Sequence, residues 1–180
     1  MPKQGILGDV LPTLQKRASL PDETIEQIRF FEAHSGRVYK LLSETYPVAN
    51  INDFMTIYAE RLPEEERGTD RESADRTISC FHYEKEPSRY HGVPFVFLLR
   101  DGEVFKDTKE RLSKRTGIKG KQLDKLKFAV IRGGQSYARP LYVDDEDVLS
   151  EKMAPDDVLG LEHANKTRNP WAVHERLNIR

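Results

Sequence analysis

The order of β-type and helix-type segments in the C-terminal half constrains the fold of this chain more than any other feature of its sequence. Residues 77–83 and 93–100 are rich in β-branched and aromatic types, and the turn-forming stretch 84–92 separates them. A helical pattern follows at 103–118, with Gly117 as its expected stop signal. Three more strands are expected after this helix, at 127–133, 139–143 and 158–163.

The expected helix has an apolar side and a charged side. Phe105, Thr108 and Leu112 recur at helical spacing, whereas Asp107 and Arg111 lie one turn apart on the other side and are placed to pair. This pattern places Arg111 among the charged residues, opposite the core.

The order is therefore strand, strand, helix, strand, strand, strand. A hairpin with one helix across its face, followed by further strands in a mixed sheet, describes the ubiquitin-like β-grasp, an α+β fold. In the first strand, alternation predicts Phe81 and Tyr83 on one face of the sheet and Ile78 and Cys80 on the other.

The N-terminal half repeats the end of the same pattern. Residues 9–18 are predicted to form a helix with Asp9 as its N-cap and a proline in its first turn. Strands are expected at 26–33, 37–44 and 54–62, which gives the order helix, strand, strand, strand. That order is a β-grasp without its opening hairpin. Either the chain starts inside a domain, or this half is a reduced variant.

A charged segment separates the two halves. Residues 63–76 are dominated by acids and arginines, and Ala74 is their apolar exception. Such a segment is expected to bury nothing and to connect two domains. The predicted organisation is a partial domain at 1–66, a linker at 67–76, a β-grasp domain at 77–164 and a tail at 165–180.

Composition excludes several classes of protein. Lys and Arg number 29 against 30 Asp and Glu, so the sequence lacks the broad positive field that nucleic-acid binding requires. The longest apolar stretch, 93–99, is far too short to span a bilayer. The single cysteine, Cys80, rules out an internal disulfide framework and favours a reducing compartment. We expect an intracellular protein of the nucleus or cytoplasm, with no nucleic-acid or membrane partner.

Cys80 and His82 lie two apart on a predicted strand, which suggests a nucleophile and its base. No third group that would orient the base is evident, and neighbours on one strand face rarely reach attack geometry, so we expect a structural role. The five histidines show no metal-ligand spacing, and a zinc site is not expected with one cysteine. We predict no catalytic residue, no metal and no cofactor for this chain.

Three other segments have both a functional and a structural interpretation. Residues 132–136, RGGQS, resemble a phosphate-binding loop, but they join two strands and are better explained as a hairpin turn. The acidic stretch 144–157 suits a basic partner or, more simply, a solvated loop. Pro94, Phe95 and Phe97 are candidates for an exposed binding patch, although strand alternation leaves at most half of them exposed.

The last residues, 166–180, are too polar for a core and too apolar for a plain tail. In an extended segment Leu177 and Ile179 lie on one side, where they form an aliphatic hook for a groove on another module. Two alternatives stay open. The tail folds back on its own domain through Trp171 and Val173, or it is helical, since Val173 and Leu177 are four residues apart.

Several segments in register give the chain a family likeness. Residues 78–112, 125–131 and 158–166, which include HGVPF, KFAVI and LGLEH, resemble the final ubiquitin-like domain of the herpesvirus-associated ubiquitin-specific protease and its fungal relatives. Residues 9–66 are similar, from the helix onward, to the penultimate ubiquitin-like domain of that family.

The resemblance implies a function. The parent protein would be a deubiquitinase, a thiol protease with a catalytic domain and a row of ubiquitin-like domains. The family's catalytic cysteine and histidine boxes have no match here, so this chain alone is not expected to be an enzyme.

The resemblance also implies a role for the tail, as a regulatory peptide that docks on the catalytic domain of the same polypeptide and activates it allosterically. Leu177 and Ile179 match the family's aliphatic pair, Trp171 lies at its aromatic position, and Val173 is counted with them as a contact. The alternative is a free-standing ubiquitin-fold adaptor that binds partner proteins through a sheet face.

Overall fold

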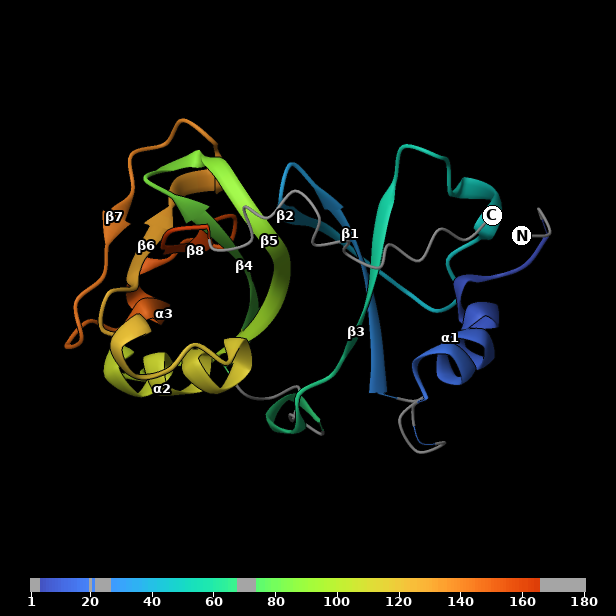
Figure 1. Ribbon diagram of the computed structural model, residues 1–180, viewed down its shortest axis with the longest axis horizontal. Helices are drawn as coiled ribbons and strands as arrows, with labels where there is room; N and C mark the ends of the chain where they lie inside the picture. The colour runs from blue at the N-terminus through green and yellow to red at the C-terminus, as the bar shows by residue number, and fades with distance from the viewer. Residues whose placement is uncertain (1–3, 20, 22–26, 68–73, 166–180) are drawn as a thin grey trace. The chain divides into compact units, whose positions relative to one another are not determined.

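A computed structural model describes residues 4–19, 21, 27–67 and 74–165 of the chain (Figure 1). These residues form two compact units, 4–34 with 39–67 and 35–38 with 74–165. Each unit is built on one β-sheet. Among the described residues, no helix combines the length and apolarity needed to cross a membrane.

The second unit contains a five-stranded sheet in the order β5-β4-β8-β6-β7, with β4 parallel to β8 and the other neighbours antiparallel. This order, with a helix between the second and third strands along the chain, is the predicted ubiquitin-like β-grasp. The strands are β4 (Arg76–Glu84), β5 (Glu86–Leu99), β6 (Lys127–Ile131), β7 (Leu141–Tyr142) and β8 (Val158–Glu162), and the helices are α2 (Phe105–Thr116) and α3 (Leu149–Lys152).

Helix α2 packs on one face of this sheet and buries Phe105 and Leu112 against it (Figure 1). Ile78 and Cys80 of β4 belong to the same core. The opposite face of β4 carries Phe81 and Tyr83, whose rings stack 5.5 Å apart in a second cluster, so the predicted alternation is confirmed. Gly117 ends α2 in the left-handed conformation, as its position predicted.

The first unit has α1 (Leu11–Ala18) followed by β1 (Ile28–His34), residues 39–42 of β2 (Arg37–Leu42) and β3 (Thr56–Arg61). Its sheet has the order β2-β1-β3. The core of this unit joins the start of the helix to the strands through Val10, Leu11, Phe30 and Leu42, among others. Short 3₁₀ turns across the chain lie at Leu7–Val10, Val48–Asn50, Glu64–Glu66, Gly120–Gln122 and Arg132–Gly134.

The first unit matches the second from the helix onward. Its order β2-β1-β3 corresponds to β7-β6-β8, the last three strands of the complete β-grasp. Isolated bridges recur at equivalent places, since Ile6 pairs with Pro47 before α1 and Val104 pairs with Val148 before α2. The described residues of this unit contain no counterpart of β4 and β5, in agreement with the predicted missing hairpin.

Two local expectations were wrong at the ends of elements. Asp9 is not the N-cap of a helix, because it lies inside the 3₁₀ turn and accepts a hydrogen bond from the Ile6 N–H at 2.9 Å. The turn expected at 84–92 is centred on Lys85, which has a φ of 65°, and β5 already begins at Glu86. A register irregularity between Tyr83 and Glu84 accommodates the extra β5 residues, so a turn-rich composition here marks a bulged strand.

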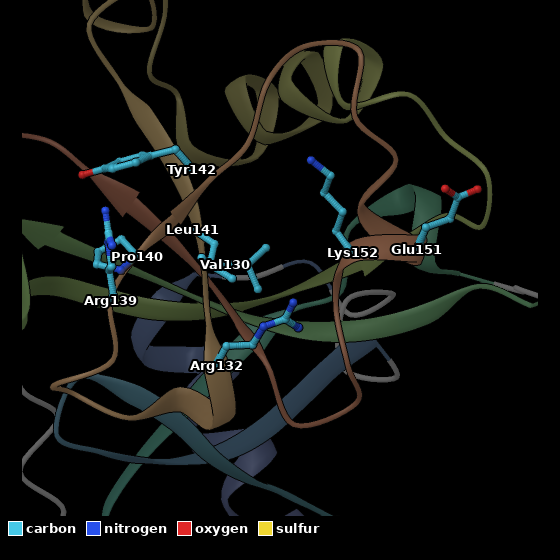
Figure 2. Close-up of a pocket in the computed structure, with 8 residues that line it drawn as sticks. All are labelled: Val130, Arg132, Arg139, Pro140, Leu141, Tyr142, Glu151 and Lys152. Carbon is cyan, nitrogen blue, oxygen red and sulfur yellow. The ribbon is translucent and has the colours of Figure 1, made fainter.

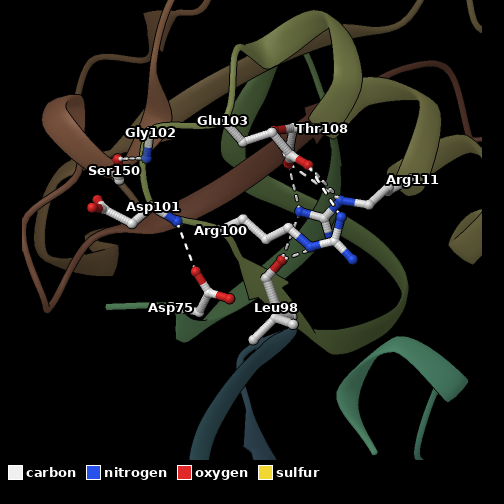
Figure 3. A network of polar contacts seen from close by, with 9 residues as sticks. All are labelled: Asp75, Leu98, Arg100, Asp101, Gly102, Glu103, Thr108, Arg111 and Ser150. Carbon is white, nitrogen blue, oxygen red and sulfur yellow. Dashed lines mark hydrogen bonds and ion pairs between the residues drawn. The ribbon is translucent and has the colours of Figure 1, made fainter. Parts of the chain in front are cut away.

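Arg111 does not lie on the exposed side of α2. Its guanidinium donates to both Glu103 carboxylate oxygens, at 2.6–3.2 Å, and to the Leu98 carbonyl at 3.0 Å (Figure 3). Thr108 adds a hydrogen bond to Glu103 at 2.7 Å. Arg111 was predicted to pair with Asp107. It instead binds Glu103 and the Leu98 carbonyl and so connects α2 to the end of β5. Figure 3 also shows the loop after β5 held by Asp101 N–H to Asp75 and by Gly102 N–H to Ser150, both at 3.0 Å.

The acidic stretch 144–157 is more than a solvated loop. It contains α3, and its last residue, Asp157, is 5% exposed. Asp157 accepts hydrogen bonds from the N–H groups of Gly133 and Ala154 and pairs with Arg132. Burial alone would raise the pKa of Asp157, but these bonds hold it below its ordinary value. The same bonds account for RGGQS, residues 132–136. This segment is a turn between β6 and β7, and the Gly133 N–H donates to Asp157 of the same chain instead of to a phosphate.

Two further expectations fail on burial. The charged segment 63–76 was expected to bury nothing, yet its residue Glu66 pairs with Arg29 and has a side chain 4% exposed. The candidate surface patch does not exist, because Pro94, Phe95 and Phe97 are all buried, the last two in the core beneath α2. Pro94 fits inside β5 because β5 is an edge strand, where a missing N–H donor costs little.

Candidate functional site

The four residues predicted for the regulatory tail, Trp171, Val173, Leu177 and Ile179, lie outside the described residues. Their role stays a prediction. The structure does describe the segment that leads into the tail. There the backbone leaves the sheet after β8, at His163, Ala164 and Asn165.

A cluster of three histidines surrounds this point. His82 of β4 pairs with His91 of β5 in the sheet register, and β8 runs beside β4 and ends directly before His163. The rings of His82 and His163 are 5.0 Å apart, and those of His91 and His163 are 4.7 Å apart, edge to face in both cases. We call His82, His91 and His163 the histidine cluster.

Hydrogen bonds tie the histidine cluster to the backbone. His82 Nδ1 lies 2.9 Å from His163 Nε2, and His91 Nε2 lies 3.1 Å from the His163 carbonyl oxygen. The His163 N–H donates to the Tyr83 carbonyl at 3.0 Å, and its Nδ1 lies 3.1 Å from the Ala164 oxygen. The cluster therefore fixes both the side chain and the backbone at the exit from β8.

The pKa of His82 is lowered to about 4, mainly by burial and in smaller part by the neighbouring His163 and His91. The ring is accordingly neutral at pH 7. The cluster could not be found from sequence spacing, because its members come from three strands or strand ends that only the sheet topology brings together. The described part of the chain contains no group of three or more His, Cys, Asp or Glu arranged to hold a metal ion.

Cys80 and His82 do share a face of β4, as expected, but they do not form a catalytic pair. The thiol of Cys80 is fully buried in the core beneath α2, and Nδ1 of His82 is directed to His163. A nucleophilic cysteine needs an accessible thiolate next to its base. The interpretation of Cys80 as a core residue fits this position.

A pocket of about 640 Å³ lies beside the edge strand β7 (Figure 2). Figure 2 shows the side chains of Arg132 and Lys152 on either side of Val130. Both cations already have partners, since Arg132 pairs with Asp157 and Lys152 pairs with Asp147. The remaining lining residues are Arg139, Pro140, Leu141, Tyr142 and Glu151. Because Arg132 and Lys152 are paired and Arg139 and Glu151 have opposite charges, this pocket gives no clear preference for a charged ligand.

Comparisons with known proteins place the chain in a family. The family model described as "Ubiquitin-specific protease C-terminal" matches residues 1–168. The chain is 35% identical over 163 residues to ubiquitin carboxyl-terminal hydrolase 15 of Schizosaccharomyces pombe, covering 89% of this chain and 14% of that protein. It is 33% identical over 180 residues to ubiquitin C-terminal hydrolase 12 of Arabidopsis thaliana, covering 93% of this chain and 16% of the relative. The chain thus spans only a small part of these relatives.

Proposed function

Because the chain belongs to the ubiquitin-specific protease C-terminal family, we propose that it is the non-catalytic regulatory end of a ubiquitin-specific cysteine protease. Its role is to present the tail, 165–180, to the catalytic domain of the same polypeptide and to raise the rate of ubiquitin cleavage. The observation that carries this proposal is a family match running through both units to the exit from β8.

The position of the lone cysteine supports a non-catalytic role for this chain. Cys80 is the only cysteine in the sequence, and it is fully buried. A thiol in that position has no access to a substrate. The cysteine that cleaves ubiquitin therefore has to come from another part of the parent protein.

The binding free energy expected for two aliphatic side chains suits reversible regulation. Burying two aliphatic side chains such as Leu177 and Ile179 contributes roughly 3–5 kcal/mol, and ordering the segment costs a few kcal/mol of this. The remaining affinity is weak, but a tether on the same polypeptide supplies an effective concentration of about a millimolar. To activate, the tail must bind the active state of the catalytic domain more tightly than the inactive one.

The test adds this chain to the separate catalytic domain and measures cleavage of a ubiquitin amide. We expect stimulation by the wild-type chain and its loss in the double variant Leu177→Ala and Ile179→Ala, because about 3 kcal/mol of lost burial weakens docking roughly a hundredfold. Asn178→Ala is the matched control, since it removes a side chain from the opposite side of an extended segment. Equal rates with and without the wild-type chain would refute the proposal.

The alternative of a free-standing adaptor is not favoured. An adaptor would bind partners through a sheet face, and the patch proposed for binding on β5 is not available, because Pro94, Phe95 and Phe97 are buried.

A further inference from the structure

We propose that the histidine cluster is a proton-sensitive joint, which holds the backbone at His163 and Ala164 against the last β-grasp domain at neutral pH and releases it on acidification. The joint is a property of this chain alone. Its consequence for catalysis, that acid loosens the base of the regulatory tail, rests on the proposed function.

The hydrogen bonds of the cluster define one arrangement of protons. Carbonyl oxygens only accept, so His163 Nδ1 carries the hydrogen that it donates to Ala164, and His91 Nε2 carries the one that it donates to His163. In neutral His163 the other nitrogen, Nε2, is then an acceptor, and His82 Nδ1 must donate to it. All three rings satisfy these bonds in the neutral state.

The pair of His82 and His163 tolerates one added proton but not two. With one added proton, one of the two facing nitrogens carries a hydrogen and the other still accepts it, so the bond is kept. A second proton places N–H groups on both facing nitrogens, which are 2.9 Å apart, so the hydrogen bond is lost and two cations face each other. Breaking this contact removes the side-chain anchor of His163.

The charged groups on the elements around the cluster do not oppose this release. On β4 and β5, Glu84 and Arg89 already form an ion pair with each other at 3.5 Å. From α2, Arg115 lies over the ring of Phe95, which is itself 5.8 Å from the His82 ring. Arg115 is thus a cation on the α2 side of the cluster. The nearby carboxylate of Glu84 is already paired with Arg89.

Two other charged groups of the described residues, Glu162 of β8 and its cross-strand neighbour Lys127 of β6, lie on the other side of the sheet. Glu162 of β8 accepts a hydrogen bond from the Tyr142 hydroxyl at 2.6 Å. It belongs to the face that carries Tyr83, whereas Leu161 of β8 packs in the core beneath α2, on the face of Cys80 and His82. The electrostatic influences on His82 itself come from His163 and His91.

The direction of the pH effect follows from the pKa of His82. Its pKa is about 4 in the closed joint and returns toward 6.5 once the ring is released, so the open form binds protons more tightly. Opening is therefore favoured as the pH falls from about 6.5 toward 4. Between pH 7 and pH 4.5 these two values increase the opening equilibrium by about 50-fold.

The experiment follows hydrogen exchange of the His163 amide, which the closed joint bonds to the Tyr83 carbonyl, in the whole chain by NMR. After correction for intrinsic exchange, we expect protection in the wild type to fall about 50-fold from pH 7 to pH 4.5. The amides of Ala129 and Ile131 in β6, which are buried, provide the reference for global stability and should keep their protection.

His82→Gln is the test variant, because an amide side chain retains hydrogen-bonding atoms but gains no charge. In this variant we expect protection of the His163 amide to change less than threefold over the same pH range. His34→Gln, at an exposed position on β1, is the control and should behave as the wild type. The proposal is overturned if protection in the wild type does not fall, if His82→Gln loses as much as the wild type, or if β6 opens in parallel.

A second measurement separates the joint from its consequence. The chain is added to the catalytic domain at pH 7.5 and at lower pH, with His82→Gln in parallel, and stimulation by the wild type should decrease more on acidification than stimulation by the variant. Failure to stimulate at any pH would refute the proposed function and leave the exchange result intact. Stimulation that falls equally for both chains would refute the link between the joint and the tail.

Discussion

Replacing Glu103 by alanine is expected to lower the free energy of unfolding of the second unit by about 3–5 kcal/mol, the range measured when one partner of a buried ion pair is removed. The side chains of Arg111 and Glu103 are only 10% and 12% exposed. Without Glu103, the guanidinium keeps the Leu98 carbonyl and the Phe97 ring, 4.7 Å away, but has no compensating negative charge. Urea denaturation followed by circular dichroism measures the effect.

Two further variants separate the ion pair from the loss of a surface charge. Glu110→Ala changes an exposed residue of α2, the helix of Arg111, and should cost less than about 0.5 kcal/mol. Glu103→Gln keeps acceptor and donor atoms and should cost about half as much as alanine. A loss below about 1 kcal/mol for Glu103→Ala would mean that Arg111 is adequately solvated without its partner.

The Glu103 interaction also has a defined pH dependence. Burial alone would raise the pKa of Glu103, but hydrogen bonds from Arg111 and Thr108, with the charges of Arg111 and Arg100, lower it below 4.5. Its contribution is therefore complete above pH 4.5 and is lost as the pH falls through the lower pKa of the folded state. The stability difference between wild type and Glu103→Gln should shrink in that acid range.

The topology could be predicted from the sequence because each element carries its own local signal. Alternation in β4 assigned Phe81 and Cys80 to opposite faces, and Gly117 marked the end of α2. The order of these elements along the chain then predicted the β-grasp fold. The same reasoning predicted that the first unit has the last three strands of this fold.

Features that depend on contacts distant in the sequence were missed. Helical spacing suggested Asp107 as the partner of Arg111, but the fold brings Glu103 and the Leu98 carbonyl to the guanidinium, and a buried bidentate pair outweighs an exposed pair one turn apart. The histidine cluster was missed for the same reason. His163 is 81 positions from His82 along the chain, and only the parallel pairing of β4 with β8 makes them neighbours.

The turn around Lys85 was misjudged for a different reason. Residues 84–92 have turn-forming composition, but β4 pairs with Glu86, Tyr90 and His91 of this stretch, and this pairing overrides the local preference. Burial of Phe95 and Phe97 likewise depends on a distant element, because α2 covers their face of the sheet. Alternation predicts which residues share a face, but whether a face is covered depends on where the helix packs.

Replacing Gly160 by valine is expected to destabilise the second unit by about 3 kcal/mol or more, at the upper end of overpacking effects. Gly160 pairs with Phe81 in the parallel β4–β8 ladder, and a Cβ atom there would lie 2.6 Å from Tyr83 Cε1 and 3.3 Å from Phe81 Cε1. Both rings are fully buried, so neither can move aside freely.

The cost at Gly160 is steric and does not come from the backbone, because its φ lies outside the left-handed region that favours glycine. Gly160→Ala, with one added methyl group, should therefore be intermediate, at about 1–3 kcal/mol. Combining Gly160→Ala with Tyr83→Leu removes the ring that the new methyl group meets. If the clash is the cause, the double variant loses less stability than the sum of the two single variants, by about 1 kcal/mol in a double-mutant cycle. Strict additivity would show that the rings adjust without cost and that the glycine is not required for this packing.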